Sequence, residues 1–279
     1  MDLKYQYFGN GWSEVSPAPL VILHGMFGMG ENWQGIAQEL SKNRSVWTID
    51  LPGHGQSYRE NEQKISYHYT DLAKAVSVCL EGIKNQSALS QDQKFIICGH
   101  SMGAKIGMAL ALLQPKLVKG LVAVDSGPID YRNRGYNQDV LKMLAEMQLA
   151  GYQDRMAASQ AMSRWVPDPA LQGFLLKGLK KNQDGYLQWR FDAAGLLRAA
   201  ADIADWPFEQ ANFQPFQGPA LFLAGALSDY VSLPDDEKII HAYFPNATIE
   251  QIPQARHWVH VDNRVVFLMH LSEFLLTIG

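Results

Sequence analysis

Short apolar runs alternate along the chain with longer stretches in which apolar residues recur at helical spacing. Residues 20–23 and 46–49 are mostly bulky or β-branched, which is typical of strands buried on both faces. Residues 31–40 and 67–83 instead carry apolar side chains three and four positions apart, as amphipathic helices do. This alternation predicts an α/β fold, a mostly parallel sheet with helices on both faces.

The pattern predicts eight strands in all. They are expected at residues 3–8, 12–15, 20–23, 46–49, 95–98, 121–124, 220–224 and 247–252. The first two are separated by the turn sequence Gly9-Asn10-Gly11, which indicates a hairpin.

The chain changes character between the sixth and seventh expected strands, where residues 130–215 contain helical segments and no convincing strand. Helices are expected from a cap at Asn137 to Gly151, and then at residues 154–165, 169–179 and 187–204. We therefore predict a core of residues 1–129 and 216–279. The helical insertion 130–215 should cover the carboxyl ends of the strands as a lid, because open α/β sheets bind ligands there.

Composition and charge narrow the class of protein. With 279 residues and 47% hydrophobic side chains, the chain can bury a large core. A formal net charge of −4 gives no sign of a nucleic-acid or anionic-membrane partner. The N-terminal residues lack the apolar segment of a signal peptide, and no apolar run reaches transmembrane length. We expect a cytoplasmic protein without membrane insertion, and its oligomeric state stays open.

The two cysteines lie in apolar surroundings. Cys79 falls in an expected helix and Cys98 in an expected strand. We interpret them as buried thiols rather than as a disulfide or a metal pair, and we expect neither a metal nor a cofactor.

The strand at residues 95–98 runs directly into Gly99-His100-Ser101-Met102-Gly103, and small, helix-forming residues follow. A strand, a sharp turn and a helix are the context in which Gly-x-Ser-x-Gly forms a nucleophile elbow. Glycine at positions 99 and 103 removes side chains that would collide in so tight a turn. The start of the following helix also favours negative charge. We predict that Ser101 is a nucleophile.

A serine nucleophile needs a base, and eight histidines compete for that role. His257 is the preferred candidate because it follows the last expected strand and precedes the final helix, and His260 is the second choice. His24 and His100 adjoin the two glycine-containing loops, which they should hold by hydrogen bonds. The remaining candidates are interpreted as surface or helix residues: His54, His68, His241 and His270.

An acid that orients the base can come from either of two strand ends. Asp125 directly follows one strand, and Asp229 lies in the loop after the next strand. Neighbouring parallel strands lie about 4.8 Å apart, so a carboxylate at either end could reach the imidazole. Asp192, in the insertion, is a third candidate.

Two backbone amides should bind the oxyanion that forms during acyl transfer. The residue after the nucleophile, Met102, supplies one of them, and the loop after His24-Gly25 supplies the other from Met26 or Phe27.

These residues together resemble the α/β-hydrolase superfamily over nearly the whole chain. The matching motifs are the His24-Gly25 loop, Asp50-Leu51-Pro52-Gly53-His54-Gly55-Gln56-Ser57, the elbow and His257-Trp258. Within the superfamily, the chain resembles the small intracellular esterases of the bacterial YbfF type and their mitochondrial relatives. That closer resemblance rests on Val124-Asp125-Ser126-Gly127-Pro128-Ile129-Asp130-Tyr131 and Ser228-Asp229-Tyr230-Val231-Ser232.

The resemblance ranks the three candidate acids. Most superfamily members have the acid three residues after a strand-end glycine, where this chain has Ser228. The YbfF type takes its acid from the end of the preceding strand and adds the serine to the site. This implies Asp125 as the acid and Ser228 as an auxiliary group, with Asp229 second and Asp192 third.

The resemblance implies a serine hydrolase that cleaves carboxylic esters, with acyl thioesters as a further possibility, through an acyl-serine intermediate. Serine at the elbow argues against dehalogenases and most epoxide hydrolases, which use aspartate there. Alternatives on the same scaffold are a carbon–carbon bond hydrolase, a cofactorless haloperoxidase, a lyase of menaquinone synthesis and a binding protein without turnover.

The substrate is less well defined by the sequence. Side chains that could line an acyl pocket, or equally pack within the lid, are Met26, Phe27, Met29, Met102, Met143, Met147, Met156, Met162, Trp165 and Phe174. Cations that could meet an anionic carrier, or form a solvated surface, are Lys177, Lys180, Lys181, Arg190 and Arg198.

Overall fold

A computed structural model describes residues 2–9, 11, 17–58, 65–87, 89–134, 138–152, 154–208 and 213–279. Its centre is a seven-stranded sheet with the order β1-β3-β2-β4-β5-β8-β9. The strands are β1 (Tyr5–Phe8), β2 (Leu20–Leu23), β3 (Val46–Ile49), β4 (Phe95–His100), β5 (Val118–Val124), β8 (Ala220–Gly225) and β9 (Ala247–Ile252). Only the edge pair β1–β3 is antiparallel among these strands.

The predicted mostly parallel sheet is thus confirmed. Seven of the eight expected strands belong to it, and the remaining one, residues 12–15 of the expected hairpin, lies outside the described residues. The expected capping residue Asn137 also lies outside them.

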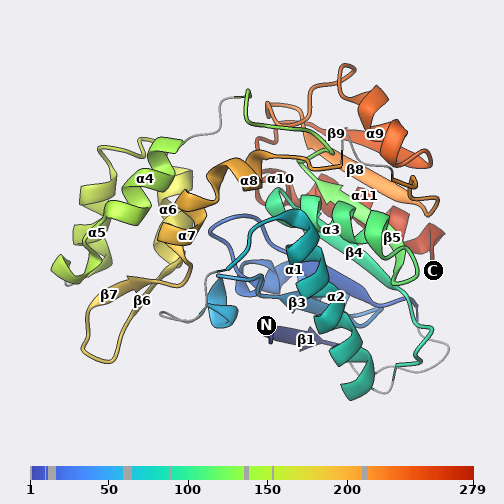
Figure 1. Ribbon diagram of the computed structural model, residues 1–279, viewed down its shortest axis with the longest axis horizontal. Coiled ribbons are helices and arrows are strands. Elements are labelled where there is room, and N and C mark those ends of the chain that lie inside the picture. The colour runs from blue at the N-terminus through green and yellow to red at the C-terminus, as the bar shows by residue number, and fades with distance from the viewer. Residues whose placement is uncertain are drawn as a thin grey trace.

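Helices cover both faces of the sheet, as predicted (Figure 1). Outside the insertion they are α1 (Gln34–Leu40), α2 (Tyr69–Gln86), α3 (Met102–Leu113), α9 (Glu237–Tyr243), α10 (Val259–Asp262) and α11 (Arg264–Thr277). Side chains alternate along the strands: Val21 and Leu23 pack with α2 and α3, whereas Leu20 and Ile22 pack with α1 and α11. Cys79 and Cys98 are free and buried. In the ranges described, no helix combines the length and apolar character needed to cross a membrane.

The chain between β5 and β8 forms a mainly helical insertion, which lies to the left of the sheet in Figure 1. Its elements are α4 (Gln138–Glu146), α5 (Arg155–Met162), α6 (Pro169–Lys177), β6 (Leu179–Lys181), β7 (Leu187–Trp189), α7 (Ala193–Arg198) and α8 (Ala200–Ala204). Asp154 and Asp168 cap α5 and α6 with their carboxylates, because the first amides of a helix lack intrahelical partners.

The two strands of the insertion correct the prediction that it contains none. β6 and β7 form an antiparallel hairpin. The helix expected at 169–179 therefore ends earlier, at Lys177, and the helix expected at 187–204 begins later, at Ala193. The turn between them is built by Asn182, whose side chain accepts hydrogen bonds from the Asp184 and Tyr186 amides, and by Gly185 at a φ of +85°. Strands of three residues are too short to show a clear alternation in the sequence.

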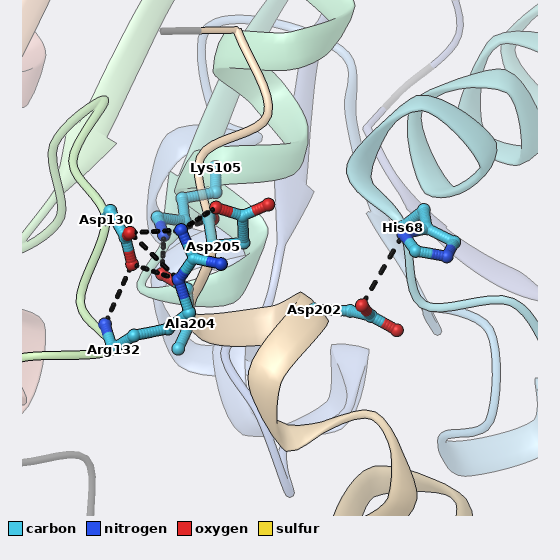
Figure 2. Close-up of polar contacts among 7 residues, drawn as sticks. All are labelled: His68, Lys105, Asp130, Arg132, Asp202, Ala204 and Asp205. Atoms are coloured by element: carbon cyan, nitrogen blue, oxygen red, sulfur yellow. Dashed lines mark hydrogen bonds and ion pairs between the residues drawn. The ribbon is translucent and has the colours of Figure 1, made fainter.

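The returning end of the insertion is tied to α3, and the two ends of the insertion are tied to each other (Figure 2). The buried Lys105 ammonium donates to the carbonyls of Ala204 at 3.0 Å and Asp205 at 2.8 Å, at the carboxyl end of α8. At the entry to the insertion, Arg132 pairs with Asp130 and, at 3.0 Å, with Asp205. The helix that begins next to Ser101 therefore anchors the segment by which the insertion returns to the core.

Candidate active site

Ser101 stands at the turn between β4 and α3 with a φ of +53°, a backbone conformation that only a strongly constrained non-glycine residue keeps. The flanking glycines make that turn possible. A Cβ at Gly99 would come within 2.2 Å of the Gly103 carbonyl oxygen, and one at Gly103 would come within 2.4 Å of the Leu23 carbonyl oxygen. The steric argument for the elbow therefore matches the geometry.

His257 lies in the loop between β9 and α10, and its imidazole meets the candidate acid. Its Nδ1 is 2.7 Å from Asp125 Oδ2, across 132 residues of sequence. The His257 side chain is 25% exposed, whereas Asp125 is completely buried. His257 and Ser101 line the same cavity, which has a volume of about 240 Å³.

Asp125 is held by three hydrogen-bond donors. Its Oδ1 accepts from the Gly225 amide at 2.9 Å, and its Oδ2 accepts from Ser228 Oγ at 2.5 Å as well as from His257. A buried carboxylate needs such donors, because nothing else replaces the water that it has lost. Asp125 also has a positive φ of +48°, and its side chain reaches the end of β8, where Gly225 and Ser228 bind it.

The other two candidate acids are used differently. Asp229 is exposed in the loop after β8. Asp192 caps α7, where its carboxylate accepts from the Gly195 amide at 2.8 Å. Within the described part of the chain, Asp125 is the one carboxylate hydrogen-bonded to His257.

The buried histidines near the site are structural. His24 Nδ1 donates to the Gly25 carbonyl and its Nε2 accepts from the Leu51 amide, so the ring joins two loops. Burial lowers the pKa of His24 to about 4. His100 Nε2 donates to the His257 carbonyl at 2.8 Å, and burial holds its pKa well below the usual value. The loop-holding role predicted for these two residues agrees with their contacts.

The prediction for His54 was wrong. It is fully buried rather than at the surface, because the turn at Pro52-Gly53 folds its ring under the loop that follows His24. Its Nδ1 donates to the Pro52 carbonyl, its Nε2 accepts from the Phe27 amide, and burial lowers its pKa to about 3. The Pro-Gly-His-Gly sequence signals such a turn, although periodicity does not reveal the burial.

His260 packs away from the cavity that Ser101 and His257 share. Its ring stacks on Trp33 with centroids 4.0 Å apart, and burial lowers its pKa to about 3. By contrast, His68 lies at the surface, while His241 on α9 and His270 on α11 are half-buried helix residues. These positions confirm the prediction for the three.

The candidate oxyanion donors are backbone amides of two segments, the loop after His24 and the start of α3. The Phe27 amide donates to His54 Nε2 at 3.3 Å, which directs it away from a substrate oxygen. Met26 lines the cavity, and Met102 is the first residue of α3, where a helix leaves its amides without intrahelical acceptors.

The cavity is mostly apolar and has walls from both parts of the molecule. The core supplies Met26, Phe27, Tyr230 and Trp258, while the insertion supplies Val140, Asp168, Leu171 and Phe174. A second cavity of about 30 Å³ adjoins Ser101, and Met102 and Lys105 are among its lining residues. None of the five candidate cations of the insertion lines the larger cavity, and Arg190 is paired with Glu31 at 2.7 Å.

Most of the candidate methionines and aromatic residues lie elsewhere. Met29 and Met162 are buried in the packing, and Met156 is 69% exposed. Met143, Met147 and Trp165 line a different groove, between α4 and α5. In the ranges that the structure describes, no group of three His, Cys, Asp or Glu side chains is arranged to hold a metal ion.

Comparisons with known proteins agree with the fold. A family model described as alpha/beta hydrolase fold matches residues 18–264. The sn-1-specific diacylglycerol lipase ABHD11 of Xenopus laevis is 34% identical over 99% of this chain and 84% of its own length. The esterase YbfF of Escherichia coli is 28% identical over 92% of this chain and 93% of its own. Among solved structures, a marine microorganism esterase superposes with a TM-score of 0.85 at 30% identity, over 98% of this chain and 99% of that one.

Proposed function

The chain belongs to the α/β-hydrolase fold family, and we propose that it is a serine hydrolase that cleaves carboxylic esters. The observation that carries this proposal is the hydrogen bond of 2.7 Å between His257 Nδ1 and the buried Asp125. His257 and the elbow residue Ser101 line the same cavity. Relatives named as a lipase and esterases support the same class of reaction.

In the proposed reaction, Ser101 Oγ attacks the ester carbonyl while His257 Nε2 takes the hydroxyl proton. Asp125 accepts from Nδ1–H and thereby keeps the Nε2 lone pair available. The Met26 and Met102 amides bind the oxyanion of the tetrahedral intermediate. The intermediate then breaks its bond to the alcohol oxygen, which takes the proton from His257, and an acyl-serine remains.

Water completes the cycle. His257 takes a proton from the water, the hydroxide attacks the acyl carbonyl, and a second tetrahedral intermediate collapses. The bond to Ser101 Oγ breaks, Oγ regains its proton from His257, and the carboxylic acid leaves. No group outside the chain is consumed except the ester and one water molecule.

The shape of the cavity bears on the substrate. Its volume of about 240 Å³ is below that of typical drug-sized ligand sites, and most of its lining is apolar. We therefore propose a short or medium apolar acyl or alcohol group, with the insertion acting as the lid over it. An acyl thioester would use the same steps, with a thiol as the leaving group.

A series of p-nitrophenyl esters from acetate to palmitate, run beside Ser101→Ala, tests the proposal. We expect turnover that is highest for short chains and a loss of about 10⁶-fold in kcat for the variant, because the nucleophile is gone. A fluorophosphonate should add once, on the peptide that contains Ser101. Circular dichroism of the variant controls for folding.

The outcomes separate the alternatives. Unchanged turnover in Ser101→Ala would contradict the proposal. Fluorophosphonate labelling without ester turnover would favour a reaction on another bond, such as a carbon–carbon bond. A single stoichiometric burst of p-nitrophenol with no further turnover would favour a binding protein.

A further inference from the structure

An aromatic ring lies flat on the imidazole of His257. The Tyr230 and His257 ring centroids are 3.9 Å apart, and the two planes differ by 17°. Tyr230 belongs to the loop between β8 and α9, so this contact joins that loop to the His257 loop. The hydrogen bond to Asp125 instead joins the His257 loop to the end of β5. The stack covers one face of the imidazole, while the Asp125 carboxylate binds its Nδ1 edge.

The contacts of Tyr230 fix its ring in that position. The Tyr230 amide donates to Ser228 Oγ at 3.3 Å, and the same hydroxyl donates to Asp125. Tyr131 packs beside the ring with centroids 5.5 Å apart, and the Tyr131 hydroxyl in turn accepts from the Gly127 amide at 2.8 Å. One short loop thus supports both the acid and the base.

Apart from the Asp125 carboxylate, the titratable groups that face His257 stay uncharged over the neutral range. His100 from β4 and His260 from α10 both have a pKa lowered by burial, to about 3 for His260. Burial raises the pKa of Tyr230, so its ring remains a neutral phenol.

We propose that Tyr230 is a positioning residue that holds the plane of the His257 ring and favours its protonated form during acyl transfer. The proposal rests on the proposed function of Ser101 and His257. An aromatic face attracts a cation within about 6 Å of its centroid and interacts less with a neutral ring. The stack therefore stabilises the imidazolium that forms when Ser101 loses its proton more than it stabilises the resting imidazole.

A purely structural role for Tyr230 makes a different prediction. Tyr230 also lines the cavity beside Ser101, so it could act only as a wall for substrate. Loss of a wall changes KM, and the basicity of His257 stays unchanged as long as no water enters the space that is left. Water that enters an emptied cavity would favour the charged imidazole and raise the His257 pKa, which is opposite in sign to the effect of losing the stack.

The experiment compares Tyr230→Leu with Tyr230→Phe in the full-length protein. For Tyr230→Leu we expect the apparent pKa on the acid limb of the kcat/KM profile to fall by about half a unit. We also expect kcat to fall by roughly five- to tenfold because the ring plane is no longer held. Tyr230→Phe keeps the stack and should stay within about twofold of the wild type.

Trp258→Leu is the matched control. Trp258 lines the same cavity, but its ring centroid is 6.5 Å from that of His257 and the planes are tilted by 50°. This variant should raise KM without moving the acid limb. An unchanged or raised pKa in Tyr230→Leu, or an equal loss of kcat in Tyr230→Phe, would overturn the proposal.

An NMR titration of the His257 ring separates this proposal from the proposed function, because it needs no substrate. The His257 pKa should be lower in Tyr230→Leu than in the wild type whether or not the protein hydrolyses esters. Equal pKa values would overturn the stacking role alone. Absence of serine-dependent turnover with a shifted pKa would overturn the proposed function alone.

Discussion

Two neighbouring strands end side by side at the candidate site, and each is followed by an aspartate. β5 and β8 pair in parallel with Val124 opposite Leu223, so their carboxyl ends reach the same edge of the sheet. Asp125, after β5, is completely buried and accepts three hydrogen bonds. Asp229, after β8, is exposed. Both residues are aspartates close to the end of a strand, but one is buried and hydrogen-bonded and the other is exposed.

The difference lies in where the hydrogen-bond donors are. Two of the three donors to Asp125, the Gly225 amide and Ser228 Oγ, come from the end of β8 and its loop. The β8 end therefore supplies donors and the β5 end supplies the acceptor. A carboxylate loses its hydration on burial, and preorganised donors are what make that burial tolerable.

The largest effect that this comparison predicts is that of Asp125→Asn. The asparagine oxygen can keep the hydrogen bond from the Gly225 amide, which places the NH2 group where Oδ2 was. That group donates to His257 Nδ1 and so favours the tautomer whose Nε2 carries the proton. We expect kcat for the p-nitrophenyl esters to fall by about 10⁴-fold. Steady-state kinetics measure the loss, and thermal unfolding of the variant checks that the fold persists. A loss of less than tenfold would remove Asp125 from the role of acid.

The contrast between buried and exposed groups also applies to the histidines. His260 is buried with its pKa lowered to about 3, and its Nδ1 has no hydrogen-bond partner within the described ranges, whereas His68 is exposed. Because the folded state resists protonation of His260, its contribution to stability is complete above about pH 6.5. That contribution is lost as the pH falls toward 3.

His260→Phe tests this second contrast. Phenylalanine keeps an aromatic ring against Trp33 and does not titrate. Between pH 8 and pH 5, the free energy of unfolding should therefore fall by about 2 kcal/mol less in the variant than in the wild type. Urea unfolding at the two pH values measures the difference. His68→Gln is the control and should leave the pH dependence unchanged, and equal slopes for all three proteins would contradict the argument.

Ser228→Ala tests the share of the β8 loop in holding the acid. It removes one donor to the buried Asp125 and leaves the Gly225 amide and His257 in place. A hydrogen bond to a charged group contributes about 1.5–3 kcal/mol, so we expect a loss of roughly tenfold in kcat and a lower melting temperature. Kinetics and thermal unfolding measure both. Full activity with unchanged stability would show that Ser228 is dispensable to the carboxylate.

The sequence could predict the parts of this site that depend on neighbouring residues. The elbow is one of them, because the clash that excludes side chains at Gly99 involves Gly103, only four positions away. The parallel sheet is another, since each buried strand shows its apolar character within a few residues. His257 could be selected because it follows the last strand.

The acid could not be chosen from the residues alone, since its environment is assembled over long distances. The donors to Asp125 lie 100, 103 and 132 residues along the chain. A resemblance to a family was needed to rank Asp125 above Asp229. The burial of His54 was missed for the same reason, because it depends on the Phe27 loop 27 residues away. The β6–β7 hairpin was missed because its strands contain only three residues each.

The smallest expected effect, that of Asp229→Asn, is also the sharpest test of the comparison. Asp229 is isosteric with its replacement, exposed, and without a hydrogen bond to His257 in the described structure, so solvent screens whatever charge it contributes. We expect kcat and KM to stay within about twofold of the wild type, measured beside Asp125→Asn with the same ester. If Asp229→Asn instead lost activity by 100-fold or more while Asp125→Asn kept it, the acid would belong to the β8 end. Burial and hydrogen bonding would then be the wrong criteria for identifying it.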